Sequence, residues 1–533
     1  METRSARILL VEDNPRWRRT VGGVLQRAGF NLTSANSIAA ARESLRKGFF
    51  HLIVLDIQMD ASDASNEDGM HLLKELSELN LLDSTRVVML SGWGTLKRMR
   101  DAFSRYQVAD FFTKNDFKGS EFVARVQQIF AESVKCNLNL DIQWQTGDAV
   151  EGVRNLRIDG NRIKKDTAGQ DLLAAELEDL LCRLFHSAIG ILARPLKRGQ
   201  SGNGVLTVQP FYSFGAGQAR VVKYGQVSEI YNENHNFETY VKNYLGRSTI
   251  VHAIRRTPRL AGILYSFLGA ANEQTESFSD YYTHASISDV QEVLDRLFLV
   301  TCEAWYSSPG QLRPLDLTRH YQERMGFTQE NLERAVADKL KANLGKNNTL
   351  SFAVLGDRSF NNPIPAVATK RFIRTTYECI THGDLNASNI FVDSDRHAWL
   401  IDFGCTGPGH ILRDVAELDS MVRFQLLSGD SATLEERLLL EEALNEIALT
   451  NIGGSSVKFV TENPAVAKAF HVSLHLRSLA AKLTSPHRDT DMSEYQIALL
   501  YYGVNTIRFY ALDTVQRQHA LISSSLLADR ISP

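Results

Sequence analysis

The residues of the chain with the densest chemistry lie in one short stretch, 380–404, which reads ITHGDLNASNIFVDSDRHAWLIDFG. Asp384 precedes Asn389 by five residues, and Asp402 follows thirteen residues later. The pattern predicts a strand, a tight loop and a hairpin, which can direct these three side chains at one point. A carboxylate and an amide can bind Mg²⁺ while a second carboxylate accepts a hydroxyl proton, so the stretch indicates phosphoryl transfer from a nucleoside triphosphate.

A second set of polar residues follows apolar runs near the start of the chain. Glu12, Asp13, Asp56, Ser91 and Lys114 each stand where such a run ends. Three carboxylates in one crevice would repel one another unless a cation lay between them, and an all-oxygen cluster suits Mg²⁺. The lysine and the serine hydroxyl could then hold an anion on the central carboxylate.

These residues need a parallel sheet to bring them together, and the first 135 residues predict one. The expected strands are 7–13, 30–36, 51–56, 86–92 and 109–114, and the expected helices are 15–28, 37–48, 68–79, 94–105 and 119–134. Runs such as 52–55 lack polar alternation, as in parallel strands covered by helices on both faces, so a doubly wound α/β domain follows. In such a sheet the site forms beyond the carboxyl ends of the strands.

With these positions in order, residues 5–134 closely resemble response-regulator receiver domains. The resemblance implies that Glu12 and Asp13 bind Mg²⁺ together with Asp56, that Asp56 is phosphorylated, and that Ser91 and Lys114 contact the phosphoryl group. It also implies that the aromatic side chain of Phe111 changes rotamer on activation. The plainer interpretation is that all of these are ordinary polar residues at strand ends.

The receiver resemblance implies partners for this domain. The sequence also departs from the receiver pattern at two places. It implies a histidine kinase or another phosphodonor, and it admits a homodimer through residues 94–105, 109–114 and 119–134. Asn115 stands where a proline is usual, and the loop after Asp56 is lengthened, with Asp60 where a proline is common. Both changes could alter the switch surface, although neither removes a reactive group.

The second chemical stretch has its own resemblance. H-G-D-x-x-x-x-N followed by I-D-F-G is similar to the aminoglycoside/choline phosphotransferase branch of kinase-like proteins, which implies ATP and Mg²⁺ as cofactors. By that resemblance Asp384 is catalytic, Asn389 and Asp402 hold Mg²⁺, and His382 supports the loop. The run CTGPGHILRDVAELD resembles bacterial ternary-complex-associated kinase-like domains, with Asp414 expected to anchor the helix that follows. The alternative is a catalytically inactive nucleotide binder.

The kinase resemblance requires a small ATP-binding lobe before the catalytic stretch, and residues 188–224 predict successive strands. Gly199, Gly202 and Gly204 would let backbone amides approach phosphates. Lys223 lies in an otherwise apolar strand, where a lysine needs an acidic partner.

The expected partner of this lysine lies on the next helix, residues 229–245. Glu233 is favoured because it shares a face with apolar residues, while Glu229 and Glu238 remain alternatives. The run 261–269 is expected to be the hinge strand that meets adenine at Tyr265 and Phe267.

The predicted organisation has four parts. Residues 1–135 form the receiver, 136–184 a connector with a helix at 171–185 capped by Asp171, 185–270 the ATP-binding lobe, and 271–533 the catalytic lobe. The expected fold is therefore a doubly wound (βα)₅ receiver followed by a bilobal α+β protein-kinase-like fold. A helix is expected at 287–306. Residues 310–376 form an insertion with a helix at 328–344 and a loop at 360–367, and the kinase resemblance implies that such elements shape the acceptor site.

Composition narrows the function classes. The 59 basic and 62 acidic residues nearly cancel, so neither nucleic acid nor a membrane surface is an expected partner. Five scattered cysteines without a C-x-x-C pair, and no run of about 20 apolar residues, predict a cytoplasmic protein without membrane insertion. His471 and His475 lie four residues apart and are expected to pack rather than bind metal.

We expect from the sequence a signalling enzyme in which phosphorylation of Asp56 regulates an ATP-dependent phosphotransferase. The acceptor hydroxyl could belong to a protein or to a small molecule. A competing interpretation is a nucleotide-binding pseudokinase adaptor whose partner binding is switched by the receiver. A DNA-binding regulator is disfavoured because no basic helix-turn-helix segment follows the receiver.

Overall fold

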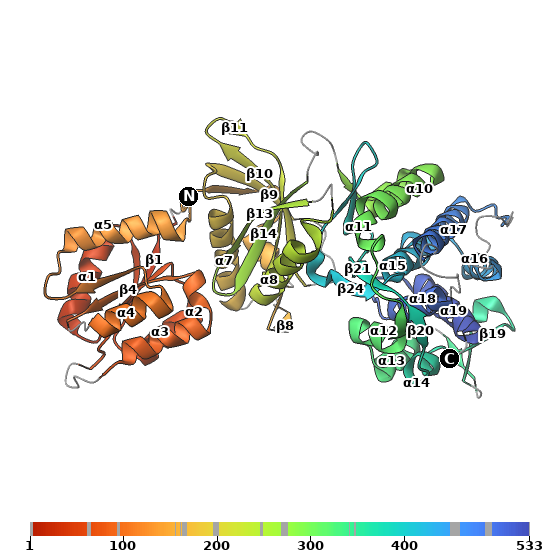
Figure 1. Ribbon diagram of the computed structural model, residues 1–533, viewed down its shortest axis with the longest axis horizontal. Coiled ribbons are helices and arrows are strands. Elements are labelled where there is room, and N and C mark those ends of the chain that lie inside the picture. The colour runs from red at the N-terminus through yellow and green to blue at the C-terminus, as the bar shows by residue number, and fades with distance from the viewer. Residues whose placement is uncertain are drawn as a thin grey trace. The chain divides into compact units, whose positions relative to one another are not determined.

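The computed structural model describes most of the chain and divides it into two compact units (Figure 1). The first unit is Met1–Asn232 with Ile250–Ser266, and the second is Glu233–Thr249 with Phe267–Pro533. The description leaves out residues 1–3, 61–65, 93–95, 155, 160, 163–167, 196–201, 246–248, 268–274, 341, 346–347, 448–458, 485–492 and 532–533.

The first unit begins with a parallel sheet of five strands in the order β2-β1-β3-β4-β5. The strands are β1 Arg7–Val11, β2 Asn31–Ala35, β3 Leu52–Asp56, β4 Arg86–Ser91 and β5 Asp110–Thr113. The central strand β3 is buried along its whole length, as its unbroken apolar run predicts.

Helices cover both faces of this sheet (Figure 1). They are α1 Pro15–Arg27, α2 Ile38–Lys47, α3 Asp68–Glu78, α4 Leu96–Tyr106 and α5 Gly119–Ile129, which a π-helical turn extends to Val134. One apolar core lies under α1 and α5, and a second lies under α2, α3 and α4. The predicted doubly wound receiver fold is confirmed.

A second sheet of seven strands follows. Its order is β13-β14-β12-β10-β9-β6, with β11 beside β10. Its strands are β6 Asp141–Trp144, β9 Gly190–Pro195, β10 Gly204–Tyr212, β11 Gly215–Ala216, β12 Arg220–Gln226, β13 Thr249–Arg256 and β14 Leu260–Phe267. The predicted connector thus contributes an edge strand, since β6 pairs in parallel with β9.

The remaining elements of the connector are α6 Ala149–Val153, the short pair β7 Arg157–Ile158 and β8 Asn161–Arg162, and α7 Ala168–Leu184. Helix α7 packs its apolar side chains into one core with β9, β10 and β12. Asp171 was predicted to cap this helix, which is wrong: α7 begins three residues earlier, so Asp171 lies within its first turn. A carboxylate there still faces the positive end of the helix dipole.

Within the first unit, the receiver contacts α7 through the amino-terminal ends of its strands. His51, at the start of β3, accepts a hydrogen bond from Arg7 N at Nδ1, so Nε2 carries the proton that is donated to Asp179 at 2.6 Å. Asp179 also accepts from Arg183 Nε at 2.7 Å, and Arg183 donates to the main-chain oxygen of Ser84 at 3.0 Å. This buried chain of hydrogen bonds therefore joins β3, α7 and the start of β4.

The second unit combines short sheets with a helical core. Helix α8, Val227–Asn236, enters it from Glu233 onward. Its strands are β15 Glu276–Ser277, β16 Arg313–Asp316, β17 Asn343–Leu344, β18 Thr349–Ser351, β19 Ser359–Asn361, β20 Ile373–Thr376, β21 Glu378–Thr381, β22 Ile390–Val392, β23 Ala398–Leu400 and β24 Gly407–His410. Its other helices are α9 Phe278–His284, α10 Ile287–Arg296, α11 Glu303–Tyr306, α12 Leu317–Met325, α13 Gln329–Lys339, α14 Ile364–Thr369, α15 Arg413–Met421, α16 Leu434–Glu446, α17 Pro464–Thr484, α18 Ser493–Thr506 and α19 Thr514–Arg530.

The insertion differs from its prediction in two segments. Residues 360–367 were expected to form a loop, but β19 ends at Asn361 and α14 begins at Ile364. The reason is that Pro365 lies in the first turn of a helix, where its missing N–H costs nothing. The predicted helix at 328–344 is shorter than expected, because α13 ends at Lys339.

Helix α15 is fixed in the second unit by a fully buried ionic network. Asp419 accepts from Arg423 Nε at 3.0 Å and from the Tyr495 hydroxyl at 3.0 Å. Arg423 also donates to both oxygens of Glu441, which accepts from His519 Nε2 at 2.9 Å. These bonds tie α15 to α16, α18 and α19, so the side chains on its first turns have a rigid support.

No helix in the described part of the chain is long and apolar enough to cross a membrane.

Candidate functional site

The receiver carries an acidic cluster at the carboxyl ends of β1 and β3. One carboxylate oxygen from each of Glu12, Asp13 and Asp56 lies within 4.8 Å of the others. Lys114 Nζ is 2.7 Å from Asp56 Oδ2 and 2.6 Å from Glu12 Oε2. The structure therefore brings together four of the receiver residues that the sequence singles out.

Two of these carboxylates, those of Glu12 and Asp56, are buried, which disfavours their charged forms. Burial raises the pKa of Glu12 to about 7, with the neighbouring Asp56 carboxylate adding to the effect. Burial also raises the pKa of Asp56, against the opposing influence of Lys114. Glu12 and Asp56 therefore resist ionising together, and with the carboxylate of Asp13 beside them they form a set of hard oxygen donors that Mg²⁺ fits.

The two other receiver predictions lie nearby on β4 and β5. Ser91 ends β4 and is buried, and its carbonyl accepts from Lys114 N at 2.9 Å. Phe111 is half-buried on β5 and packs against the core under α2, α3 and α4.

Gly69 is a site residue that sequence reasoning missed. It lies in the first turn of α3, and a Cβ there would collide with the main-chain oxygen of Asp56. Its amide also donates to Ile57 O at 3.0 Å. Only glycine lets α3 approach the end of β3 so closely, and the sequence offers no pattern that would have shown it.

A second candidate site lies in the loop between β21 and β22. Asn389 Nδ2 donates to the main-chain oxygen of Asp384 at 2.9 Å and approaches its Oδ2 at 3.4 Å. The Asp384 side chain is 34% exposed, which leaves it accessible to a reactant. Because the amide nitrogen of Asn389 is engaged, the amide oxygen is the atom that could bind a cation.

Asp402 follows β23, the strand that pairs with β22. Its backbone has φ 69° and ψ 67°, a left-handed conformation that costs about 1 to 2 kcal/mol for a residue with a side chain. Asn236 of α8 holds the turn by donating to the main-chain oxygen of Phe403 at 3.0 Å, and Ile401 N donates to Asn389 O at 3.0 Å. The strained Asp402 is thus held beside the loop that carries Asn389.

The same loop is clamped by a residue of α15. Asp414 accepts from His382 N at 2.7 Å, from Gly383 N at 2.9 Å and from the Tyr306 hydroxyl at 2.8 Å. Asp414 was expected to anchor the helix that follows, and its bonds join the first turn of α15 to the β21–β22 loop. His382 is buried, its Nε2 donates to Ile401 O at 3.0 Å, and burial lowers its pKa, so the ring is neutral.

Arg324 of α12 is a further missed residue. Its Nε donates to the main-chain oxygen of Gly383 at 3.0 Å, and its Nη2 lies 3.8 Å from Asp384 Oδ1. A cation beside a candidate catalytic carboxylate can meet phosphoryl oxygens. No spacing rule links it to Asp384, because sixty residues separate the two.

Glu417 completes the surroundings of Asp384. It accepts from Leu385 N at 3.0 Å and from the Tyr502 hydroxyl at 3.2 Å. Burial, reinforced by the negative charge of Asp384, raises the pKa of Glu417 to about 8. Near neutral pH this carboxyl is therefore largely protonated, which spares the site a second uncompensated negative charge.

The residues proposed for nucleotide binding are placed as follows. Lys223 on β12 and Glu233 on α8 are both almost fully buried, while Glu229 and Glu238 are exposed. Tyr265 is buried on β14, and the backbone of Phe267 ends that strand.

The glycines have local roles of their own. Gly202 has φ +87° beside the side chain of Arg157, and a Cβ on Gly204 would collide with the Tyr224 ring. Gly199 lies outside the described residues.

Family models match both parts of the chain. The response regulator receiver domain matches residues 8–127, in agreement with the sheet order and the acidic cluster. The fold and this site therefore define a response regulator receiver, which indicates two-component signalling and implies a phosphodonor partner. The model of ternary complex associated domain 9 matches residues 191–359 and 333–508, together more than half of the 533 residues. The chain belongs to the ternary complex associated domain 9 family.

Individual relatives match the receiver. The transcriptional activator protein PfeR of Pseudomonas aeruginosa is 30% identical over 125 residues, which are 24% of this chain and 38% of PfeR. The chain thus spans about two fifths of the length of this curated relative.

Two solved structures are similar over the same region. A CheY-like receiver domain protein of Methanospirillum hungatei is 18% identical, over 25% of this chain and 98% of that one, with a TM-score of 0.22. TrrA of Thermotoga maritima, in complex with Mg²⁺ and BeF, is 22% identical, over 23% and 98%, with a TM-score of 0.20.

Proposed function

We propose that the chain is a two-component signalling protein in which a receiver phosphorylated on Asp56 regulates an ATP- and Mg²⁺-dependent phosphotransferase centred on Asp384. The observation that carries this proposal is the bond of Asn389 Nδ2 to Asp384 O, with the strained Asp402 on the adjoining hairpin. Strain of this kind collects at functional sites, because the surrounding structure must hold it in place.

The roles of the individual residues follow from their contacts. Asp384 accepts the proton of the acceptor hydroxyl, whose oxygen bonds to the γ-phosphorus while the bond to ADP breaks. The amide oxygen of Asn389 and the carboxylate of Asp402 would hold Mg²⁺, which neutralises charge on the phosphates when bound. His382, whose ring is neutral, and Asp414, which accepts from the backbone of the loop, hold the loop in shape.

In the receiver, Glu12, Asp13 and Asp56 would hold Mg²⁺ while Asp56 takes a phosphoryl group from its donor. The acyl phosphate adds about 1.5 to 2 negative charges, which Lys114 is already placed to meet. The second sheet, with its buried Lys223, is proposed as the ATP-binding lobe of a bilobal kinase-like fold.

The proposal is tested by incubating the full chain with Mg²⁺ and ATP labelled on the γ-phosphate, and measuring ADP release and label transfer to protein and small-molecule hydroxyls. We expect Asp384→Asn and Asp402→Asn to lower turnover at least about 10²-fold. Asp395→Asn is the matched control, because Asp395 is exposed in the turn of the same hairpin. Equal turnover by all four proteins would overturn the proposal, and tight ATP binding without turnover would favour the pseudokinase adaptor.

A further inference from the structure

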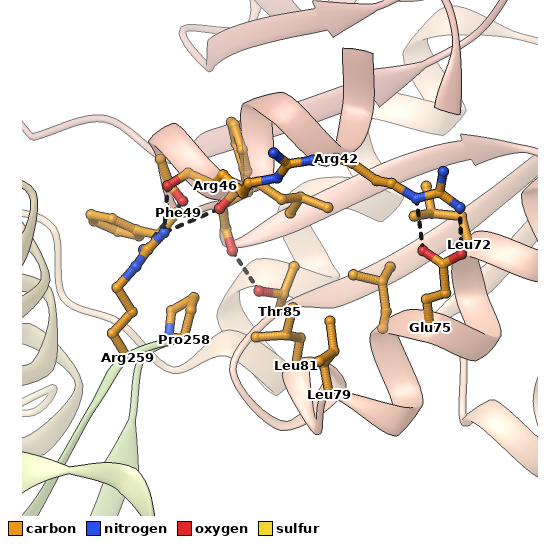
Figure 2. Close-up of a pocket in the computed structure, with 14 residues that line it drawn as sticks. Arg42, Arg46, Phe49, Leu72, Glu75, Leu79, Leu81, Thr85, Pro258 and Arg259 are labelled. Carbon is orange, nitrogen blue, oxygen red and sulfur yellow. Dashed lines mark hydrogen bonds and ion pairs between the residues drawn. The ribbon is translucent and has the colours of Figure 1, made fainter. Parts of the chain in front are cut away.

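The first unit contains a pocket far from the acidic cluster. It has a volume of about 440 Å³, within the range of small-molecule sites. Its walls are α2, the residues Gly48–Phe50 that follow it, α3, and the turn between β13 and β14 with Pro258 and Arg259 (Figure 2). The pocket therefore lies where the receiver contacts the second sheet.

The lining is mainly apolar. It includes Leu45, Phe49, Leu72, Leu76 and Leu79, and the last of these is 66% exposed although it is a large hydrophobic side chain. The pocket opens to solvent, as the exposure of Leu79 shows, so its apolar walls face water. An apolar occupant would remove this surface from water, which is favourable.

Most polar groups at the walls are already engaged within the protein. Arg42 Nε donates to Glu75 Oε2 at 2.9 Å, and Thr85 Oγ1 donates to Phe50 O at 2.8 Å. Arg259 donates to the main-chain oxygens of Leu45, Arg46 and Gly48 and forms an ion pair with Glu176. None of these groups needs a ligand.

Arg46 is the exception at the mouth. Its side chain is 74% exposed, and its ion pair with Glu43 is long, at 3.6 Å. Glu43 is shared with Lys47, whose Nζ is closer, at 2.9 Å. The Arg46 guanidinium can therefore turn to an anionic group at little cost.

We propose that this pocket binds a small molecule with an aromatic or aliphatic body and one anionic group, the body among the leucines and the anion at Arg46. Such a ligand would contact both α2 of the receiver and the turn from which β14 starts. It would hold the receiver against the second sheet whether or not Asp56 is phosphorylated, and it requires no catalysis at Asp384.

The test uses the full chain and two fluorescent probes with the same body. Anilinonaphthalene sulfonate carries an anion, and N-phenyl-1-naphthylamine does not. We expect saturable binding of both at one molecule per chain. Arg46→Glu should weaken binding of the sulfonate about three- to tenfold and leave the neutral probe unchanged. Arg19→Glu, an equal charge change at an exposed position of α1, should affect neither.

Gly48→Leu tests the pocket itself. Gly48 has φ −145°, which any residue adopts, and a Cβ there would lie in ordinary contact with the Phe50 ring, 3.7 Å away. Leucine should fill the space and abolish binding of both probes. Unchanged binding by this variant, or an equal response of the two probes to Arg46→Glu, would overturn the proposal. Arg46→Glu changes an exposed side chain and should fold normally. It therefore tests the proposal even if Gly48→Leu does not fold.

Discussion

Asp56 is the proposed phosphoacceptor of the receiver. Asp56→Asn removes the nucleophilic oxygen while keeping the size of the side chain, so uptake of a phosphoryl group from acetyl phosphate and Mg²⁺ should fall to background. Mass spectrometry of the intact chain measures this phosphoryl uptake. Asp60→Asn, four residues later and exposed, should label like the unchanged protein. If Asp56→Asn were labelled at the normal rate, another residue would be the acceptor of the phosphoryl group.

In the proposed phosphotransferase, Arg324 should act by positioning the loop between β21 and β22. Arg324→Ala removes the donor to Gly383 O and the cation near Asp384, so kcat should fall about 10²-fold with little change in the KM for ATP. Arg324→Lys should recover part of the loss. Arg319→Ala, on the same helix but exposed and paired with Glu323, is the control. A larger change in KM than in kcat would contradict the positioning role.

Glu417 makes a prediction about pH. Its pKa is raised in the folded chain to about 8, so the unfolded chain ionises first and stability falls as pH rises from about 4.5 to about 8. Glu417→Gln removes this loss. The melting temperature of the variant relative to the unchanged protein should therefore rise between pH 5 and pH 9, by about 3 °C or more. A difference that does not change with pH would show that Glu417 ionises normally.

At the residue scale, the sequence predicts the groups that lie at strand ends or within one short motif. Glu12, Asp56 and Lys114 could be placed because parallel strands end at a common edge. Asp414 and Arg324 could not be given their roles, because their partners lie in loops that only the tertiary fold brings near. A hydrogen bond to the backbone can be made to any residue type, so the sequence of the partner does not reveal it.

At the scale of elements, the loop between β21 and β22 depends on a glycine. Gly383 has φ +81°, and a Cβ would collide with the guanidinium of Arg413 and with Cys405 O. Gly383→Ala should therefore cost well over the roughly 1 kcal/mol expected from backbone conformation alone. Gly326→Ala is the matched control, since Gly326 has φ +58° and open space around it. Urea unfolding compares the two, and equal losses would show that the loop can move aside.

Element boundaries were predicted well where apolar periodicity was strong. The receiver strands match their apolar runs. A run such as 52–55, which is apolar without alternation, is typical of a strand buried on both faces. Asp171 and residues 360–367 were misjudged because a helix can begin on small or proline-containing sequence that carries no apolar period. Local sequence decides the middle of an element better than its ends.

At the scale of the whole first unit, Asp179 should determine how firmly the receiver is attached. Asp179→Ala leaves Arg183 buried without its carboxylate and His51 without its acceptor, which should cost about 3 to 5 kcal/mol. Hydrogen exchange in β3 and α7 should accelerate together. Glu178→Ala, whose carboxylate is partly exposed and paired with Arg4, should cost less than about 1 kcal/mol. Faster exchange in α7 alone would mean that the receiver is not held through this residue.

The attachment through His51 and Ser84 also limits how such chains can be rebuilt by exchanging modules. Suppose that a receiver domain from another protein is joined to this chain at residue 136. The side chain at the start of its third strand would then take the place of His51 beside Asp179 and Arg183. If the graft had no histidine at that strand start, or no carbonyl where Ser84 O lies, the buried ion pair of Asp179 and Arg183 would lose a hydrogen-bond partner. Hybrid proteins made by such grafts should therefore work best when the donor receiver already has a histidine at that strand start, a criterion that can be read from its sequence before any cloning.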